Sequence, residues 1–194
     1  MSVRLEVATP PRCMFLPQRL EEVFTRCFGE SLCTRLRGGA AEPVYQPAAN
    51  QDEFHVLHYR ADYFASALHE VAHWCIAGEI RRQQTDFGYW YAPDGRSPAQ
   101  QRAFERVECK PQALEWFFSK ACAYPFRLSV DNLQGRVDES PPVSGFAQRV
   151  YAQALQLQCA GLPERAGVFF QGLCREFDTL VDPADLRFSL GELD

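Results

Sequence analysis

Apolar residues recur every three or four positions in several stretches of the chain, a spacing typical of helices with one buried face. After Pro17 such a stretch contains Leu20, Val23, Phe24, Cys27 and Phe28, and it stops at Gly29. Residues 63–77 show the same spacing, with Asp62 as the expected N-cap and Gly78 as the stop. Both stretches are predicted to be helices, and the second one is expected to be mostly buried.

The second half of the chain predicts three more helices. The first, over residues 97–122, opens with a capping box at Ser97, and Pro111 is expected to kink it. Two further helices are expected at residues 145–160 and 163–178. Helices therefore account for most of the predicted regular structure.

Two short segments have the composition of strands. Apolar and polar residues alternate over residues 54–59, and residues 84–91 are rich in aromatic side chains. Residues 37–52 contain many Gly, Pro and Ala residues and are expected to be a loop. The fold class predicted from these patterns is α+β, mainly helical, with a small sheet.

Length and composition are those of one globular domain. The chain has 194 residues, 46% of them hydrophobic, and this is enough for a core that needs no disulfide bonds. We expect the domain to cover residues 17–179. It would be preceded by a flexible tail over residues 1–16 and followed by an acidic, solvated tail over residues 180–194.

Charge and cysteine content exclude several classes of protein. The net charge of -5 favours no nucleic-acid partner. The eight cysteines include no C-x-x-C pair, which argues against a zinc ribbon or a thioredoxin-like site. No apolar stretch is long enough to cross a membrane, and no secretory signal is recognisable. A cytoplasmic protein with reduced thiols is expected.

The strongest chemical signal is the run His69-Glu70-Val71-Ala72-His73. Two histidines four residues apart on a helix point the same way, so both imidazoles can reach one metal ion. Glu70 can then act beside the ion as a catalytic acid or base. This is the H-E-x-x-H arrangement. The alternative is a pair of core histidines packed beside Trp74.

A third protein ligand is expected from a neighbouring element. The residues that could supply it are Glu105, Glu108 and Glu115, with Asp86, His55 and His58 as weaker candidates. Glu108 lies just before Pro111, where the helix is free to bend and aim a side chain. Residue types alone leave the choice among these candidates open.

Two histidines and one carboxylate serve two kinds of chemistry. With zinc they activate water for hydrolysis, as in a peptidase, whereas with ferrous iron they leave positions open for dioxygen. A purely structural zinc site would need four protein ligands, and too few plausible ligands cluster here. The ligand types do not decide between a hydrolase and an oxygenase.

Six stretches of the sequence, taken together, closely resemble the bacterial elongation factor P hydroxylase family. They are EPVYQPA (42–48), YFASALHEVAHWCIAG (63–78), DFGYWYAPDGR (86–96), FERVECKPQALEWFF (104–118), YPFRLSVDNLQG (124–135) and GLPERA (161–166). The similarity runs from about residue 18 to about residue 178 and leaves both ends of the chain uncovered.

The resemblance implies a specific reaction and partner. Such enzymes hydroxylate a β-lysylated lysine of translation elongation factor P, and their metal site matches His69, His73 and Glu108 here. The motif helix is then similar to that of zinc metallopeptidases, in a protein that is not a protease. The expected cofactor is a divalent metal, Fe(II), with dioxygen as co-substrate. A zinc-dependent peptidase or another metal hydrolase is the alternative.

The aromatic block between the two ligand-bearing helices is the predicted substrate pocket. Tyr89, Trp90 and Tyr91 can form an apolar wall for a long side chain. Because the substrate carries amines, Asp86 or Asp94 is expected to hold an ammonium group. On a strand, Trp90 faces the opposite side from its two neighbours, so only one set of rings should matter.

Overall fold

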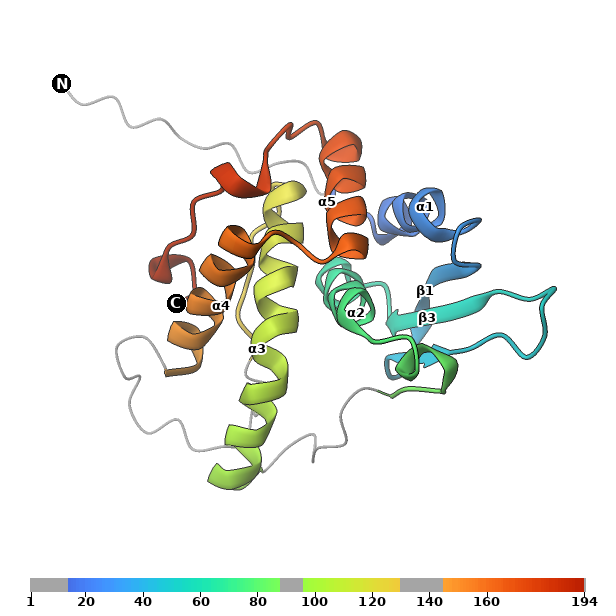
Figure 1. Cartoon of the computed structure of the whole chain (residues 1–194), viewed down its shortest axis with the longest axis horizontal. Helices are drawn as coiled ribbons and strands as arrows, with labels where there is room; N and C mark the ends of the chain where they lie inside the picture. The colour runs from blue at the N-terminus through green and yellow to red at the C-terminus, as the bar shows by residue number, and fades with distance from the viewer. Residues whose placement is uncertain (1–13, 88–95, 130–144, 194) are drawn as a thin grey trace.

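The computed structural model describes residues 14–87, 96–129 and 145–193 (Figure 1). Within them the elements are α1 (Pro17–Phe28), β1 (Thr34–Ala40), β2 (Val44–Gln46), β3 (His55–Arg60), α2 (Phe64–Ile76), η2 (Arg81–Gln83), α3 (Pro98–Ala121), α4 (Gly145–Ala160), α5 (Glu164–Phe177), η3 (Pro183–Asp185) and η4 (Leu190–Glu192). The predicted class, a mainly helical α+β domain with a small sheet, is confirmed.

The helices agree with the hydrophobic spacing, while their ends differ in detail. The capping box forms as expected: the Ser97 hydroxyl accepts from the Gln100 backbone, and the Gln100 side chain accepts from the Ser97 backbone. Asp62 is not the N-cap of α2, because the helix starts after Tyr63 without a side-chain cap. Packing of this buried helix makes a cap unnecessary.

The expected loop over residues 37–52 is wrong, because β1 and β2 lie there. The central strand β3 pairs with β1 in parallel and with β2 antiparallel. Gly38 lies so close to Tyr59 that a Cβ atom would sit 2.6 Å from the Tyr59 hydroxyl, and Gly39 has a φ of +86°. The glycines that indicated a loop are thus needed for a close approach within the sheet.

The predicted aromatic strand at residues 84–91 is only partly covered by the structure. Asp86 forms an isolated antiparallel bridge with Tyr45 of β2. The predicted pocket residues Tyr89, Trp90, Tyr91 and Asp94 lie outside the described residues.

An aromatic core joins the helices. Trp74 of α2 packs against Phe24 and Phe28 of α1, with ring centroids 5.0 Å and 4.8 Å away. Phe169 of α5 continues the cluster to Phe118 of α3. In Figure 1 the sheet lies beside α1 and α2 at one end of the molecule, and α3 and α4 lie side by side at the other. Helix α2 is thereby held between the sheet and α3.

The segment after residue 179 is not a solvated tail. Phe188 packs against Trp116 and Phe117 of α3, and Lys120 pairs with Glu192 at 2.6 Å. The apolar residues of this segment pack against the core, although the segment as a whole is acidic. At the other end Phe15 packs against Phe64, so part of the expected N-terminal tail is ordered by the core. None of the described helices has the length and apolar character needed to span a membrane.

Candidate metal centre

Helix α2 divides its residues between two faces. Its buried residues are Phe64, Ala67, Leu68, Val71, Ala72, Trp74 and Cys75. The opposite face lines a pocket of about 510 Å³ with Ala65, Ser66, His69, Glu70, His73 and Ala77, and the edge of the buried Trp74 also reaches this pocket. The pocket residues recur at the same helical spacing as the core residues, so a single helix presents both histidines and Glu70 to one space.

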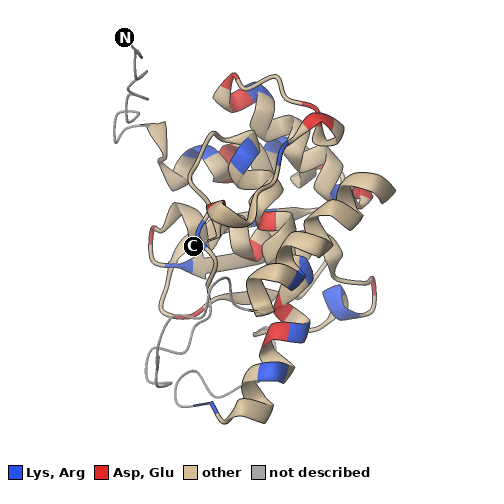
Figure 2. Ribbon diagram, turned by 90° about the vertical axis from the view of Figure 1, so that its left-hand side faces the viewer, with Lys and Arg blue, Asp and Glu red and all other residues tan. Residues whose placement is uncertain are grey.

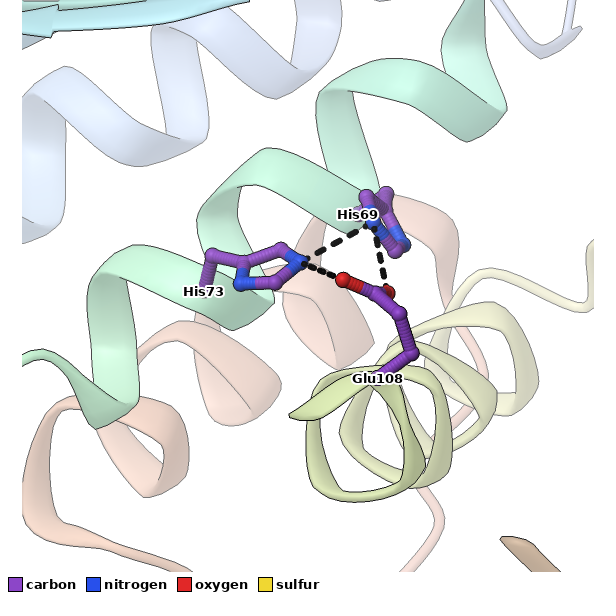
Figure 3. Close-up of side chains that lie close together, drawn as sticks. All are labelled: His69, His73 and Glu108. Atoms are coloured by element: carbon purple, nitrogen blue, oxygen red, sulfur yellow. Dashed lines mark hydrogen bonds and ion pairs between the residues drawn. The ribbon is translucent and has the colours of Figure 1, made fainter. Parts of the chain in front are cut away.

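His69 and His73, which line this pocket, come together with the buried Glu108 of α3 (Figure 3). The two Nε2 atoms lie 3.1 Å apart. The Glu108 carboxylate faces both of them, with Oε1 3.2 Å from His73 Nε2 and Oε2 3.4 Å from His69 Nε2. Two residues of α2 and one of α3 thus direct their ligand atoms at each other.

These separations fit a divalent metal. Two ligand atoms about 2.0–2.1 Å from one ion lie about 3.0–3.4 Å apart, depending on the coordination angle. Glu108 is 1% exposed, and neither of its carboxylate oxygens has a hydrogen-bond partner among the described residues. A buried carboxylate in this situation is costly unless a cation compensates it. The donor set and the buried carboxylate, which faces two imidazole nitrogens, are therefore both compatible with a bound divalent cation.

Glu115 orients one of the histidines. Its Oε2 lies 2.8 Å from Nδ1 of His69, on the opposite side of the ring from Nε2. A proton on Nδ1 leaves the Nε2 lone pair free for a metal, and such carboxylate–histidine pairs commonly support metal ligands. Glu115 lies seven residues after Glu108, two turns further along the same face of α3.

The cluster carries strongly shifted pKa values. Burial opposes a proton on His69, but the carboxylates of Glu108 and Glu115 prevail and hold the pKa of this imidazole well above its usual range. Burial also opposes ionisation of Glu108, but the two imidazoles lower the pKa of its carboxyl far below the ordinary value. Burial raises the pKa of Glu70, against the effect of the imidazoles. A metal ion would replace the proton that these groups share.

The other candidates for the third position lie elsewhere. Glu105 forms an ion pair with Arg149 of α4. Asp86 lines the pocket but forms an ion pair with Arg81. Neither belongs to the His–His–Glu cluster found among the described residues.

The histidines of β3 do not join the cluster either. His55 accepts a hydrogen bond from the Ala48 backbone at its Nδ1, and its ring stacks on Tyr45. His58 is half-buried, and burial lowers its pKa. They serve as ordinary residues of the sheet.

One supporting residue was missed by sequence reasoning. Arg165 of α5 donates from Nη2 to the carbonyl oxygens of Trp74, Cys75 and Ala77, at 3.1, 3.0 and 2.5 Å. Its guanidinium thereby closes the C-terminal end of α2, one turn after His73. Its position in the GLPERA stretch was a signal, but no local pattern connects it to a helix about 90 residues earlier.

The sequence was compared with protein families and with curated proteins. Residues 23–185 match the family model described as elongation factor P hydroxylase. The chain is 42% identical over 170 residues to the elongation factor P lysine hydroxylase of Haemophilus influenzae, covering 86% of this chain and 94% of the relative. The match spans α2, α3 and every residue of the His–His–Glu cluster. The chain therefore belongs to the elongation factor P hydroxylase family.

Proposed function

We propose that this protein hydroxylates a β-lysylated lysine of translation elongation factor P with a divalent metal at His69, His73 and Glu108. The observation that carries the proposal is the buried His–His–Glu cluster, on a chain whose curated relative is named an elongation factor P lysine hydroxylase. Elongation factor P is the protein partner, and a translation factor as substrate favours a cytoplasmic location.

Fe(II) is the metal we propose. Two imidazoles and one carboxylate are the ligands of non-haem iron oxygenases, and they leave coordination positions open. Bound iron supplies the activation of dioxygen. In the overall reaction one oxygen atom enters a C–H bond of the substrate. The other leaves as water, and a reductant provides two electrons with two protons.

The surrounding side chains hold the substrate and move the protons. Glu70 lines the pocket beside both histidines and is the residue placed to hold or release a proton there. Glu115 keeps His69 in a fixed orientation. The pocket volume of about 510 Å³ leaves room for a long side chain, and its walls would reduce the access of water to the reacting carbon.

The binding of the substrate amines is proposed from sequence and pocket together. Asp86 lines the pocket and offers a carboxylate for an ammonium group. Arg81 already forms an ion pair with this carboxylate. Asp94 is the second proposed ammonium ligand. We retain Tyr89, Trp90 and Tyr91 as the proposed apolar wall, because in the sequence a single residue separates them from Phe87, which lines the pocket.

Intact mass spectrometry of elongation factor P tests the proposal. The β-lysylated form is incubated with the protein, Fe(II), a reductant and oxygen, and it should gain one oxygen atom. The form without β-lysine should gain none. A Glu108→Gln variant provides the metal-deficient control. No gain in mass with the intact protein, or cleavage of a peptide bond, would refute the proposal in favour of a hydrolase.

A further inference from the structure

Arginines from three separate parts of the fold line the pocket. Arg60 ends β3, Arg82 lies in η2, and Arg127 lies in the segment after α3, and all three line the pocket. We call these residues the arginine rim. Within the described part of the chain, no ion pair engages any of the three. Acidic and basic residues are otherwise interspersed over the fold (Figure 2), and the net charge is -5.

The charge inside the pocket has the opposite sign. Glu70 and Glu115 line its interior, next to the buried Glu108. These carboxylates suit the ammonium groups of a lysyl side chain, whereas guanidinium groups repel them. The arginine rim must therefore face a different part of the substrate. Because the reacting lysine belongs to a folded protein, that part is the protein surface around the lysine.

The rim also carries two exposed aromatic side chains. Tyr63 is 61% exposed and Phe87 is 63% exposed, and both line the pocket. Exposed aromatic residues beside arginines are the composition of protein-binding surfaces. The combination favours a macromolecular partner over a small anion, since a small anion would need the guanidinium groups alone.

Hydrogen bonds hold the backbone at or near two of the arginines. The Gln112 side chain, fully buried in α3, donates to the Ser129 carbonyl and accepts from the Ser129 backbone N–H, at 2.8 and 3.0 Å. This fixes the backbone that carries Arg127. The backbone N–H of Arg60 donates to the Ser66 hydroxyl of α2 at 3.1 Å. Such preorganisation reduces the entropy lost when a partner docks.

We propose that the arginine rim, with Tyr63 and Phe87, docks a carboxylate-bearing surface that flanks the target lysine of the substrate protein. Arginine pairs well with carboxylates because its planar group offers several parallel N–H donors. The rim would align the substrate and leave the lysine to enter the pocket between the arginines. The inference rests on the proposed function. It adds that the enzyme recognises acidic residues around the target lysine of its substrate.

The test compares two charge reversals of similar size. Arg60→Glu with Arg127→Glu changes two exposed rim residues, and Arg175→Glu with Arg37→Glu is the matched control at exposed positions that do not line the pocket. Affinity for β-lysylated elongation factor P is measured without oxygen, at low and at high salt. Circular dichroism and metal content verify that each variant is folded and loaded.

The rim variant should bind the substrate about tenfold more weakly or worse, and its affinity should depend less on salt than that of the unaltered protein. In turnover its KM should rise with kcat little changed. An affinity equal to that of the control variant would overturn the docking surface. So would a fall in kcat at unchanged KM, because the arginines would then act on the reacting groups or on a small anion.

The two proposals fail in different ways. If the unaltered protein adds no oxygen to elongation factor P, the proposed function is wrong whatever the rim does. If it adds oxygen and the rim variant does so with the same KM, the function stands and the docking surface is wrong.

Discussion

The two faces of α2 are made for different tasks, and adjacent residues show the contrast. Trp74 is 3% exposed and packs between the aromatic rings of α1. His73, one position earlier, keeps 19% of its side chain exposed in the pocket and contacts Glu108. One face thus fixes the position of the helix, and the other uses that position for chemistry.

The contrast separates stability from activity. Packing on the core face is favourable for folding, whereas the pocket face collects groups whose burial is unfavourable without a cation. Changes on the core face should therefore lower the free energy of unfolding. Changes on the pocket face should leave it nearly unaltered and remove metal binding.

The largest effect on stability is expected from Trp74→Ala. Loss of the indole leaves a cavity beside Phe24 and Phe28, and should lower the free energy of unfolding by about 3–5 kcal/mol. Urea denaturation measures it, and Trp74→Phe is the control that should lose clearly less. A loss under about 1 kcal/mol would show that α2 is not held by its aromatic face.

At the His–His–Glu cluster, Glu108→Gln should weaken metal binding by more than about 100-fold. Glu105→Gln, three residues earlier on the same helix, is the matched control and should bind metal normally because Glu105 pairs with Arg149. Calorimetric titration with metal gives the affinities. Because the substitution keeps the shape of the side chain, the metal-free Glu108→Gln protein should remain folded. The reverse pattern, with Glu105 required, would refute the assignment.

Substitution of Glu115 should have a smaller effect on metal binding, because Glu115 contacts the ligand His69 and is not itself a proposed ligand. Glu115→Ala should weaken metal binding by about 10–100-fold. Glu115→Gln should recover most of the loss, because its amide oxygen can still accept the Nδ1 proton. If the two variants lose the same metal affinity, Glu115 supports metal binding through its charge and not by orienting His69.

The smallest effect concerns pH and lies away from both faces of α2, in the ion pairs between α5 and α1. Burial opposes ionisation of Glu176, but hydrogen bonds from Arg19 and Arg26 prevail and lower the pKa of its carboxyl. The resulting stability is present above the ordinary pKa of 4.5 and is lost as the pH falls below it. Glu176→Gln should remove about 1 kcal/mol or less at neutral pH. Denaturation curves at several pH values should then converge for the two proteins in acid.

The spacing of apolar residues was sufficient to predict the helices, because each of them buries one continuous face. It also placed His69 and His73 on one side of α2 without knowledge of the tertiary structure. The sheet was harder to predict. Gly38 and Gly39 read as a loop, and only the contact between Gly38 and Tyr59 shows why glycine occupies a strand there.

Which glutamate meets the histidines could not be derived from spacing. Glu105, Glu108 and Glu115 all lie on α3, and the rotation of α3 against α2 decides which of them points at the cluster. That rotation results from long-range packing. The family resemblance, and not the pattern, singled out Glu108. Arg165 stayed hidden for the same reason, since its partners are the carbonyl groups of a distant helix.

The origin of the three candidate ligands has a thermodynamic consequence. Two of them belong to α2 and one to α3, so they meet only when these helices are packed together. A metal that binds this set binds the folded chain and not the unfolded one, and so shifts the folding equilibrium. At a free concentration of about 100 times the dissociation constant the shift is about 2.7 kcal/mol. The melting temperature should therefore rise with metal concentration and fall with a chelator, which makes thermal stability a readout of metal loading that needs no substrate.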